Sequence, residues 1–426
     1  MKAGMRPTFI LIGLSLLFVA LLILTAKPLT HVSLDVPLVP ASHNTLYVLY
    51  LRMAQALFGT GMGVLMAANG ALMLGVCWAV FRAGWGLADA PYRLLGATAA
   101  MVLFELNPMV IILPLTLGFL GGVLWVPLFL LVFITAMRVV ENWSTFMRAI
   151  TLALAWSLFL WVHVPSALVV LLGMIPWVCC RRRPMSSVGV FLTIFLLGTA
   201  VFSTLWAAFC ALTQRWSLVQ GPLGTLRELG AHLHQGLTTG WGGGWPAMSE
   251  RIVHAAGWLS PFFLMYGVWV SGESVIRMLR ERRASTADLA ALLSLMILGI
   301  VLFTPGKSTL PGAWYLLGVL ALWSPLIAQR LAVKENFYSR GFRLTFLAGF
   351  VVCVGTLWIL HQGGLNGALL PGAETLAKLV AAVLVAGGVS HRVLIKHPLT
   401  LENRMQALLI GSALAYFLVM DFQLMR

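Results

Sequence analysis

"TFILIGLSLLFVALLILTA", residues 8–26, decides the environment of this chain, because it is a long apolar run without a charged residue. About 20 predominantly apolar residues cross a bilayer as a helix. Lys2 and Arg6 precede the run, so a cleavable signal peptide is one interpretation. The run is long, however, and no small-residue cleavage site precedes Lys27. We therefore expect a membrane anchor with a cytoplasmic N-terminus.

Similar apolar runs repeat along the whole chain of 426 residues, of which 60% are hydrophobic and 10% charged. Soluble proteins average about 25% charged residues. The sequence predicts an all-α, polytopic integral membrane protein, a single membrane domain over residues 1–426, with about 13 transmembrane helices. The expected spans are 8–26, 59–81, 94–114, 116–137, 149–162, 166–180, 187–211, 258–275, 287–304, 312–328, 344–360, 374–390 and 405–420.

The net charge of +15 is explained by topology. With the N-terminus inside, most of the 28 lysines and arginines fall in cytoplasmic loops, as the positive-inside rule requires, provided that 149–180 crosses twice. No basic patch is interleaved with aromatic residues, so we expect no nucleic-acid partner. The outer set is Lys27, Arg52, Arg215, Arg227, Arg251, Lys307, Lys378 and Arg426.

The outer loops are polar and rich in histidine. The first, 27–58, ends in "NTLYVLYLRMAQALF", which predicts an amphipathic helix lying at the membrane interface. The second large loop, 212–257, combines glycines with tryptophans. Titratable groups gathered on one side indicate chemistry there, although histidine is also tolerated at interfaces. The substrate-pocket candidates from these loops are His31, His43, Trp241, Trp245 and His361.

"FTPGKSTLPGAW", residues 303–314, places one ammonium among hydroxyls at a predicted outer boundary. Lys307 with Ser308 and Thr309 provides donors suited to a phosphate at the headgroup level, and Arg52 and Arg251 are additional cations on the same side. A snorkelling lysine is the alternative, but it leaves the hydroxyls unexplained.

Two carboxylates are candidates for chemistry. Asp35 is the only acid in the first outer loop, where it suits a general base that deprotonates a hydroxyl acceptor. A solvated loop aspartate is an equal alternative. Glu105 in "FELNP" falls inside the third predicted span, and an intramembrane carboxylate indicates either function or a hydrogen-bonded structural role.

This layout resembles the GT-C membrane glycosyltransferases, which use polyprenyl-phosphate sugars. The segment formed by Thr304, Pro305, Lys307 and Thr309 resembles the Thr-Pro-x-Lys-x-Thr segment of actinobacterial cell-wall arabinofuranosyltransferases. A bare membrane module of this size is similar to the type IV pilin arabinosyltransferases. Two features depart from the arabinofuranosyltransferase pattern. Leu310 and Pro311 stand where that family has two histidines, and Asp35 is alone where it often has two acids. We also expect no large C-terminal carbohydrate-binding domain.

The resemblance implies an inverting glycosyltransferase in the bacterial inner membrane, with its active site facing the periplasm. It implies transfer of D-arabinofuranose from a polyprenyl-phosphate donor to a pilin Ser or Thr or to a glycan. Asp35 would act as base, and Lys307 with Arg52 would stabilise the phosphate. A divalent cation (Mg²⁺, Mn²⁺ or Ca²⁺) is compatible with this chemistry, and no metal ligand is identified.

Two other functions fit the same features. An O-antigen ligase or polymerase also uses lipid carriers, and the 212–257 loop with Arg215, Arg227, His232 and His234 resembles one loosely. A lipid flippase or secondary transporter would place ionisable residues at depth, as Glu105 is, but the two halves of the chain show no repeat.

Overall fold

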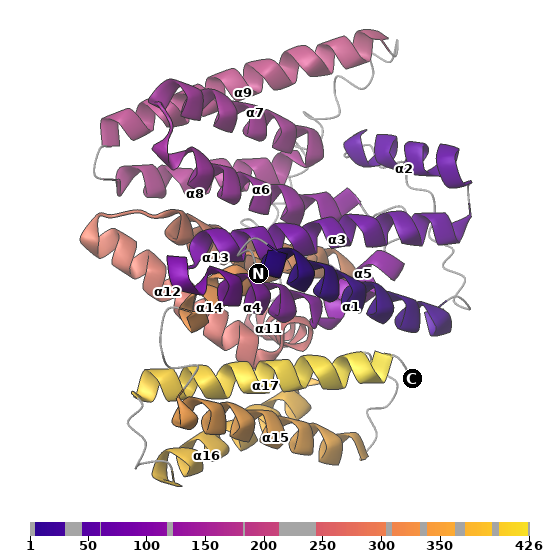
Figure 1. Ribbon diagram of the computed structural model, residues 1–426, viewed down its shortest axis with the longest axis vertical. Coiled ribbons are helices and arrows are strands. Elements are labelled where there is room, and N and C mark those ends of the chain that lie inside the picture. Colours follow the sequence, from indigo (N-terminus) through magenta and orange to yellow (C-terminus); the bar gives the residue numbers. More distant parts are fainter. Residues whose placement is uncertain are drawn as a thin grey trace.

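A bilayer interior offers no water to backbone groups, so each apolar run must satisfy its own hydrogen bonds as a helix. The computed structural model follows this rule. It describes residues 5–29, 45–59, 61–116, 122–181, 184–212, 244–303, 309–332, 339–362, 371–393 and 400–424. The regular secondary structure of these residues is helical throughout, which makes the chain an all-α membrane protein (Figure 1).

The helices run in chain order from the N-terminus. The first nine are α1 Met5–Leu29, α2 Thr45–Phe58, α3 Met62–Leu87, α4 Arg93–Glu105, α5 Pro108–Thr116, α6 Trp125–Val139, α7 Thr145–Val162, α8 Val164–Cys179 and α9 Pro184–Leu212. They are followed by α11 Gly244–Leu259, α12 Pro261–Glu281, α13 Thr286–Phe303, α14 Thr309–Ala332, α15 Arg340–Gln362, α16 Ala373–Val393 and α17 Leu401–Leu424. Two short 3-10 helices, η1 Ala90–Tyr92 and η3 Val140–Asn142, precede α4 and α7.

Within the described residues, eight helices are long and apolar enough to cross a membrane, or up to ten if each of two bent pairs counts as one span. The structure therefore supports eight to ten of the about 13 predicted spans. The apolar helices over 166–179 and 286–302 are short: at 1.5 Å per residue, the 16 residues of α8 reach roughly 24 Å, against a hydrocarbon core of about 30 Å. The prediction that 149–180 contains two separate helices is confirmed, because α7 and α8 are separated at His163.

The bundle has two ends, and many successive helices run between them in alternating directions. At one end, on the left in Figure 1, α3, α6 and α8 finish and α4, α7 and α9 begin. This arginine-rich end is defined here by Arg82, Arg93, Arg138, Arg148 and Arg181. The opposite end, called the loop end, is defined by His163, Leu302 and the start of α14, and the predicted outer loops attach there. The sequence predicts that the arginine-rich end is cytoplasmic.

α14 is the central helix, with 83% of its span buried against 11% for α1, whose apolar side chains face outward. Its Trp323 is fully buried and donates Nε1–H to the hydroxyl oxygens of Ser271 and Ser294, both at 2.8 Å. Gly267 leaves the space that the indole fills, because a Cβ there would overlap the ring. One tryptophan thus joins α12, α13 and α14.

α15 and α17 pack closely through glycines at the opposite side of the molecule from α9 (Figure 1). A Cβ on Gly349 would lie 2.6 Å from the Leu408 carbonyl oxygen, and a Cβ on Gly411 would overlap the Phe346 carbonyl. Small residues allow such backbone approach in membrane helices. We expect Gly411→Ala to destabilise the protein by about 3 kcal/mol or more, since a backbone carbonyl cannot rotate away as a side chain can.

The thermal midpoint of the purified protein in detergent measures this effect. Gly355→Ala on α15 is the matched control, because its new methyl group meets nothing within 4 Å. Equal midpoints for the two variants would contradict the close packing of α15 against α17.

Two helices are broken inside the bundle, and the breaks meet. α4 and α5 are bent by 56° at Asn107, and α11 and α12 by 100° at Ser260, whose φ is 66°. Asn107 accepts the Met109 N–H through its side-chain oxygen and donates Nδ2–H to the Trp258 carbonyl at 3.1 Å. The Tyr416 hydroxyl of α17 donates to the Gly257 carbonyl at 2.6 Å. These side chains replace the backbone bonds that the breaks remove.

Asn107→Ala should therefore cost about 2 kcal/mol or more of stability, because it removes an N-cap worth about 1 kcal/mol and leaves a buried carbonyl unpaired. Tyr416→Phe, which removes one bond of the same junction, should cost about 1 kcal/mol. Thr193→Ala is the control, since that exposed hydroxyl bonds only to Gly189 of its own helix. Thermal midpoints in the same detergent rank the three, and an Asn107→Ala midpoint equal to the control would contradict the role of Asn107.

Candidate functional site

The sequence-predicted site residues are only partly within the described structure. Asp35, His31, His43, Trp241, Lys307 and Ser308 lie outside the described residues. Three more are described as helix positions without their side chains: Thr309 begins α14, Trp245 is in the first turn of α11, and His361 is in the last turn of α15. Arg52, Arg251 and Glu105 are described in full, so the convergence of Asp35 and Lys307 on one pocket remains a prediction.

Arg251 of α11 contacts the end of α13, the helix that precedes residues 304–308 in sequence. Its Nη1 donates to the Leu302 carbonyl at 3.0 Å, so a cation of α11 caps the last turn of α13. Residues 304–308 follow this turn directly and lead into α14. This bond joins α11 to the last turn of α13 at the loop end, between residues 51 positions apart in sequence.

The predicted helix in the first outer loop is confirmed as α2, and two tyrosines fix it. The Tyr47 hydroxyl donates to Asn69 Oδ1 at 2.8 Å, and the Tyr50 hydroxyl donates to the Ala68 carbonyl at 2.7 Å. The Tyr50 ring also meets Trp125 edge to face at 5.9 Å. Arg52 on the same helix is exposed. α2 thus places an exposed cation, unpaired within the described residues, on the side of the bundle where α6 begins. Its predicted position at the membrane interface is not tested by these contacts.

His163 is a polar residue at the loop end that is not among the predicted site residues. It separates α7 from α8, and its Nδ1 lies 2.7 Å from the Ser166 hydroxyl. Its ring is 6.2 Å from that of Tyr315 in the second turn of α14. The signal was present in the sequence: "HVP" places a histidine and a proline between two apolar runs. His163 brings the α7–α8 turn to the helix that Thr309 begins.

Glu105 is buried, as predicted, with 1% of its surface exposed. It is the last residue of α4, next to the break at Asn107, and α4 places it roughly 20 Å from the arginine-rich end. The Cys77 thiol of α3 faces the carboxyl group. Neither carboxyl oxygen has a hydrogen-bond partner of ordinary geometry among the described residues. The functional role and the hydrogen-bonded structural role of Glu105 both remain predictions.

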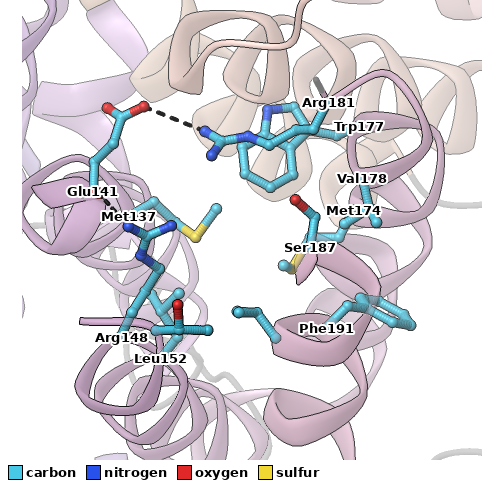
Figure 2. Close-up of a pocket in the computed structure, with 12 residues that line it drawn as sticks. Met137, Glu141, Arg148, Leu152, Met174, Trp177, Val178, Arg181, Ser187 and Phe191 are labelled. Atoms are coloured by element: carbon cyan, nitrogen blue, oxygen red, sulfur yellow. Dashed lines mark hydrogen bonds and ion pairs between the residues drawn. The ribbon is translucent and has the colours of Figure 1, made fainter. Parts of the chain in front are cut away.

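The arginine-rich end contains a small cavity of about 50 Å³ between α6, α7, α8 and α9 (Figure 2). Its polar lining is Glu141, Thr145, Arg148, Arg181 and Ser187. Since one water occupies about 30 Å³ in the liquid, this space suits a water or two and no substrate. It also lies at the other end from the motif: Trp177 beside it donates to the Ser285 carbonyl at the start of α13, whose 18 residues reach roughly 27 Å to Leu302.

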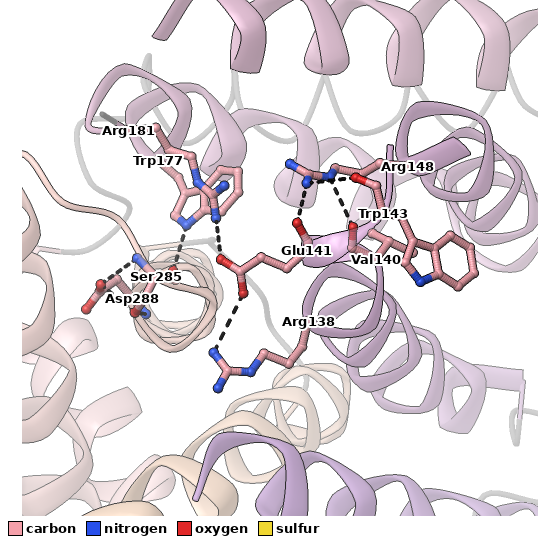
Figure 3. Close-up of polar contacts among 9 residues, drawn as sticks. All are labelled: Arg138, Val140, Glu141, Trp143, Arg148, Trp177, Arg181, Ser285 and Asp288. Carbon is pink, nitrogen blue, oxygen red and sulfur yellow. Dashed lines mark hydrogen bonds and ion pairs between the residues drawn. The ribbon is translucent and has the colours of Figure 1, made fainter. Parts of the chain in front are cut away.

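The charged residues around this cavity stabilise the fold (Figure 3). Glu141 pairs with Arg181 at 3.3 Å and with Arg138 at 3.7 Å. Arg148 donates to the backbone carbonyls of η3, and the Arg181 guanidinium lies 4.3 Å from the Trp177 ring centroid. Burial lowers the pKa of Arg181, and Glu141 opposes that shift. These contacts hold the turn between α6 and α7 against the end of α8.

Metal ligation finds no support within the described part of the chain: no three His, Cys, Asp or Glu side chains there are close enough to hold an ion.

Together, the helices define a multi-pass, all-α membrane protein with broken helices in its interior. No protein-family model matches the sequence, and no curated protein matches it significantly. The structure is similar to the crystal structure of ArnT from Cupriavidus metallidurans bound to undecaprenyl phosphate. The TM-score is 0.46 and the identity 13%, over 90% of this chain and 67% of that one.

Proposed function

We propose that this protein transfers a sugar from a polyprenyl-phosphate donor to a hydroxyl acceptor at the loop end of the bundle, with D-arabinofuranose as the sugar. The acceptor class is a Ser or Thr of a surface protein such as type IV pilin, or a glycan hydroxyl. The membrane would be the bacterial inner membrane, with the loop end facing the periplasm.

The observation that supports this proposal most is the bond from Arg251 to Leu302. It sets a cation against the helix end from which the Thr304–Thr309 stretch continues, and a phosphate is the ligand that clustered cations and hydroxyls suit. The Arg251 guanidinium is only partly buried, and the bond to the Leu302 carbonyl is its one hydrogen bond within the described residues, which leaves further N–H donors for a ligand.

In the proposed reaction the acceptor oxygen attacks the anomeric carbon of the donor, and the bond from that carbon to the phosphate oxygen breaks. Asp35 takes the acceptor proton, and the polyprenyl phosphate leaves with the bonding electron pair. Lys307, Ser308, Thr309 and Arg52 would stabilise the phosphate, and the anomeric configuration inverts. The substrate-pocket candidates Trp241, Trp245, His31, His43 and His361 would contact sugar or acceptor. A divalent cation (Mg²⁺, Mn²⁺ or Ca²⁺) is compatible with these steps.

Mass spectrometry of surface proteins and glycans, with and without this gene, tests the proposal. A pentose-sized mass on pilin or on a glycan that disappears with the gene, and returns with the wild-type copy, is the expected result. An unchanged set of masses would contradict it. A lost oligosaccharide, with pentose unaffected, would instead favour the ligase function, and Arg227→Ala and His234→Ala would then be the deleterious changes.

A lipid flippase or transporter is the second candidate, because broken helices with buried ionisable groups are typical of transporter binding sites. The junction of Asn107 with Trp258, beside Glu105, has this form. Purified protein in vesicles distinguishes the two functions. Movement of a labelled polyprenyl lipid across the bilayer without its consumption supports transport, whereas release of polyprenyl phosphate supports sugar transfer.

A further inference from the structure

A second cavity, of about 190 Å³, opens at the arginine-rich end between α3, α4 and α6. Three arginines line it, Arg82, Arg93 and Arg138, one from each helix, and none of its lining residues is acidic. The space equals roughly six water molecules, which is enough for a phosphate ester group. Three like charges that converge on one cavity repel one another, so an anion between them is stabilised by all three.

Three acids of this end are paired with arginines, and Asp89, which is exposed in the connection between α3 and α4, forms no ion pair within the described residues and does not line the cavity. Asp288 pairs with Arg277 at 3.0 Å and Glu273 with Arg330 at 2.9 Å. Glu141 pairs with Arg181 and with Arg138, and Arg138 is the one cavity arginine with which it forms an ion pair. Within the described residues Arg82 and Arg93 form no ion pair. The cavity therefore holds two guanidinium groups whose donors are available to a ligand, and Arg138 adds a third that is partly neutralised.

The surroundings indicate that the anion belongs to a lipid. All three arginines lie near helix ends: Arg93 begins α4, Arg138 is the residue before the end of α6, and Arg82 is in the last turns of α3. Apart from the arginines and Thr135, the lining is apolar and includes Trp85, a residue type enriched where membrane meets water. Val139 of the lining is 53% exposed, and Val132, two turns earlier on α6, is 44% exposed. An apolar strip thus runs from the cavity along α6 into the membrane.

We infer that the cavity of Arg82, Arg93 and Arg138 binds the phosphate of an anionic lipid in the leaflet at the arginine-rich end. Guanidinium groups bind phosphate oxygens in pairs of parallel hydrogen bonds, and basic cavities between membrane helices are known sites for acidic headgroups. The acyl chains would lie along Val132 and Val139. This site is at the end opposite to the proposed sugar transfer, and it does not depend on that function.

Native mass spectrometry of the full-length protein, titrated with phosphatidylglycerol, tests the inference. The double variant Arg82→Gln/Arg93→Gln should weaken binding of the first lipid roughly tenfold or more. Arg280→Gln/Arg283→Gln is the matched control, because it removes the same charge from exposed residues of the same end that do not line the cavity. Phosphatidylcholine should bind at least tenfold more weakly than phosphatidylglycerol to the wild type.

Arg82→Lys/Arg93→Lys keeps the charge and the fold but not the paired hydrogen bonds, so it should bind the lipid at an intermediate level. Equal losses in the two glutamine variants would overturn the inference in favour of general surface attraction. Equal binding of phosphatidylcholine would overturn it as well. Displacement of phosphatidylglycerol by millimolar inorganic phosphate would assign the cavity to a free anion and overturn the lipid assignment.

Discussion

Lys307→Ala is expected to reduce sugar transfer at least about a hundredfold at an unchanged protein level. The proposed role of the ammonium is to stabilise the charge that develops on the departing phosphate, and removal of one such donor typically costs 10²–10³ in turnover, roughly 3–4 kcal/mol of transition-state stabilisation. Lys307→Arg should retain part of the activity, because it keeps a cation of similar reach. Release of polyprenyl phosphate by purified protein, or the glycan mass on the acceptor in cells, measures the effect.

Lys378→Ala is the matched control for this change. Lys378 is also a predicted outer lysine, and it pairs with Glu374 one turn away on α16 at 2.6 Å, with both side chains largely exposed. Exposed pairs of this kind contribute little, so transfer should remain at the wild-type rate. If Lys307→Ala also transfers normally, Lys307 is a snorkelling residue and the phosphate site lies elsewhere.

The helical architecture could be predicted because hydropathy and length report directly on membrane spans. The 344–360 segment, for example, corresponds to α15 and 8–26 to α1. The breaks were missed. Residues 94–114 were predicted as one span, but the helix bends at Asn107. Pro108 was the signal for this bend, because a proline disfavours helix in the residue before it.

The 212–257 segment was predicted as loop, but its last part forms α11. Glu250, Arg251 and His254 lower the local hydropathy, so the window shows no span. The helix is nevertheless stable because its other residues pack against α12, α13 and α14, with Trp258 and Leu259 buried. α11 is therefore helical because of its tertiary packing, which the local sequence pattern does not reveal.

The sequence predicts which residue types belong to the candidate site, but it predicts their contacts only in part. A buried Glu105 follows from its position inside an apolar run, and the structure has it buried. The capping of Leu302 by Arg251 and of Trp258 by Asn107 joins residues 51 and 151 positions apart. Such contacts depend on how whole helices pack. The arginines of the larger cavity were assigned to topology alone, because a count of charges per loop does not reveal that three helices direct them at one space.

Asp35→Asn is expected to reduce turnover by roughly 10²–10⁴, the contribution of a positioned general base, because an amide of the same shape cannot accept the acceptor proton. Binding of the polyprenyl-phosphate donor should be nearly unchanged, since the base acts on the acceptor oxygen. The measurement therefore separates the two steps: turnover from product release, and donor affinity from a titration without acceptor.

Asp89→Asn is the control, because Asp89 is an exposed aspartate in the connection between α3 and α4 at the arginine-rich end, far from the proposed chemistry. Wild-type turnover in Asp35→Asn would make Asp35 a solvated loop residue and remove the base from the proposed reaction. Reduced donor binding without an additional loss in turnover would place Asp35 in donor recognition. A loss confined to turnover, with Asp89→Asn unaffected and the donor still bound, requires that the chain's first outer loop contacts the reacting hydroxyl.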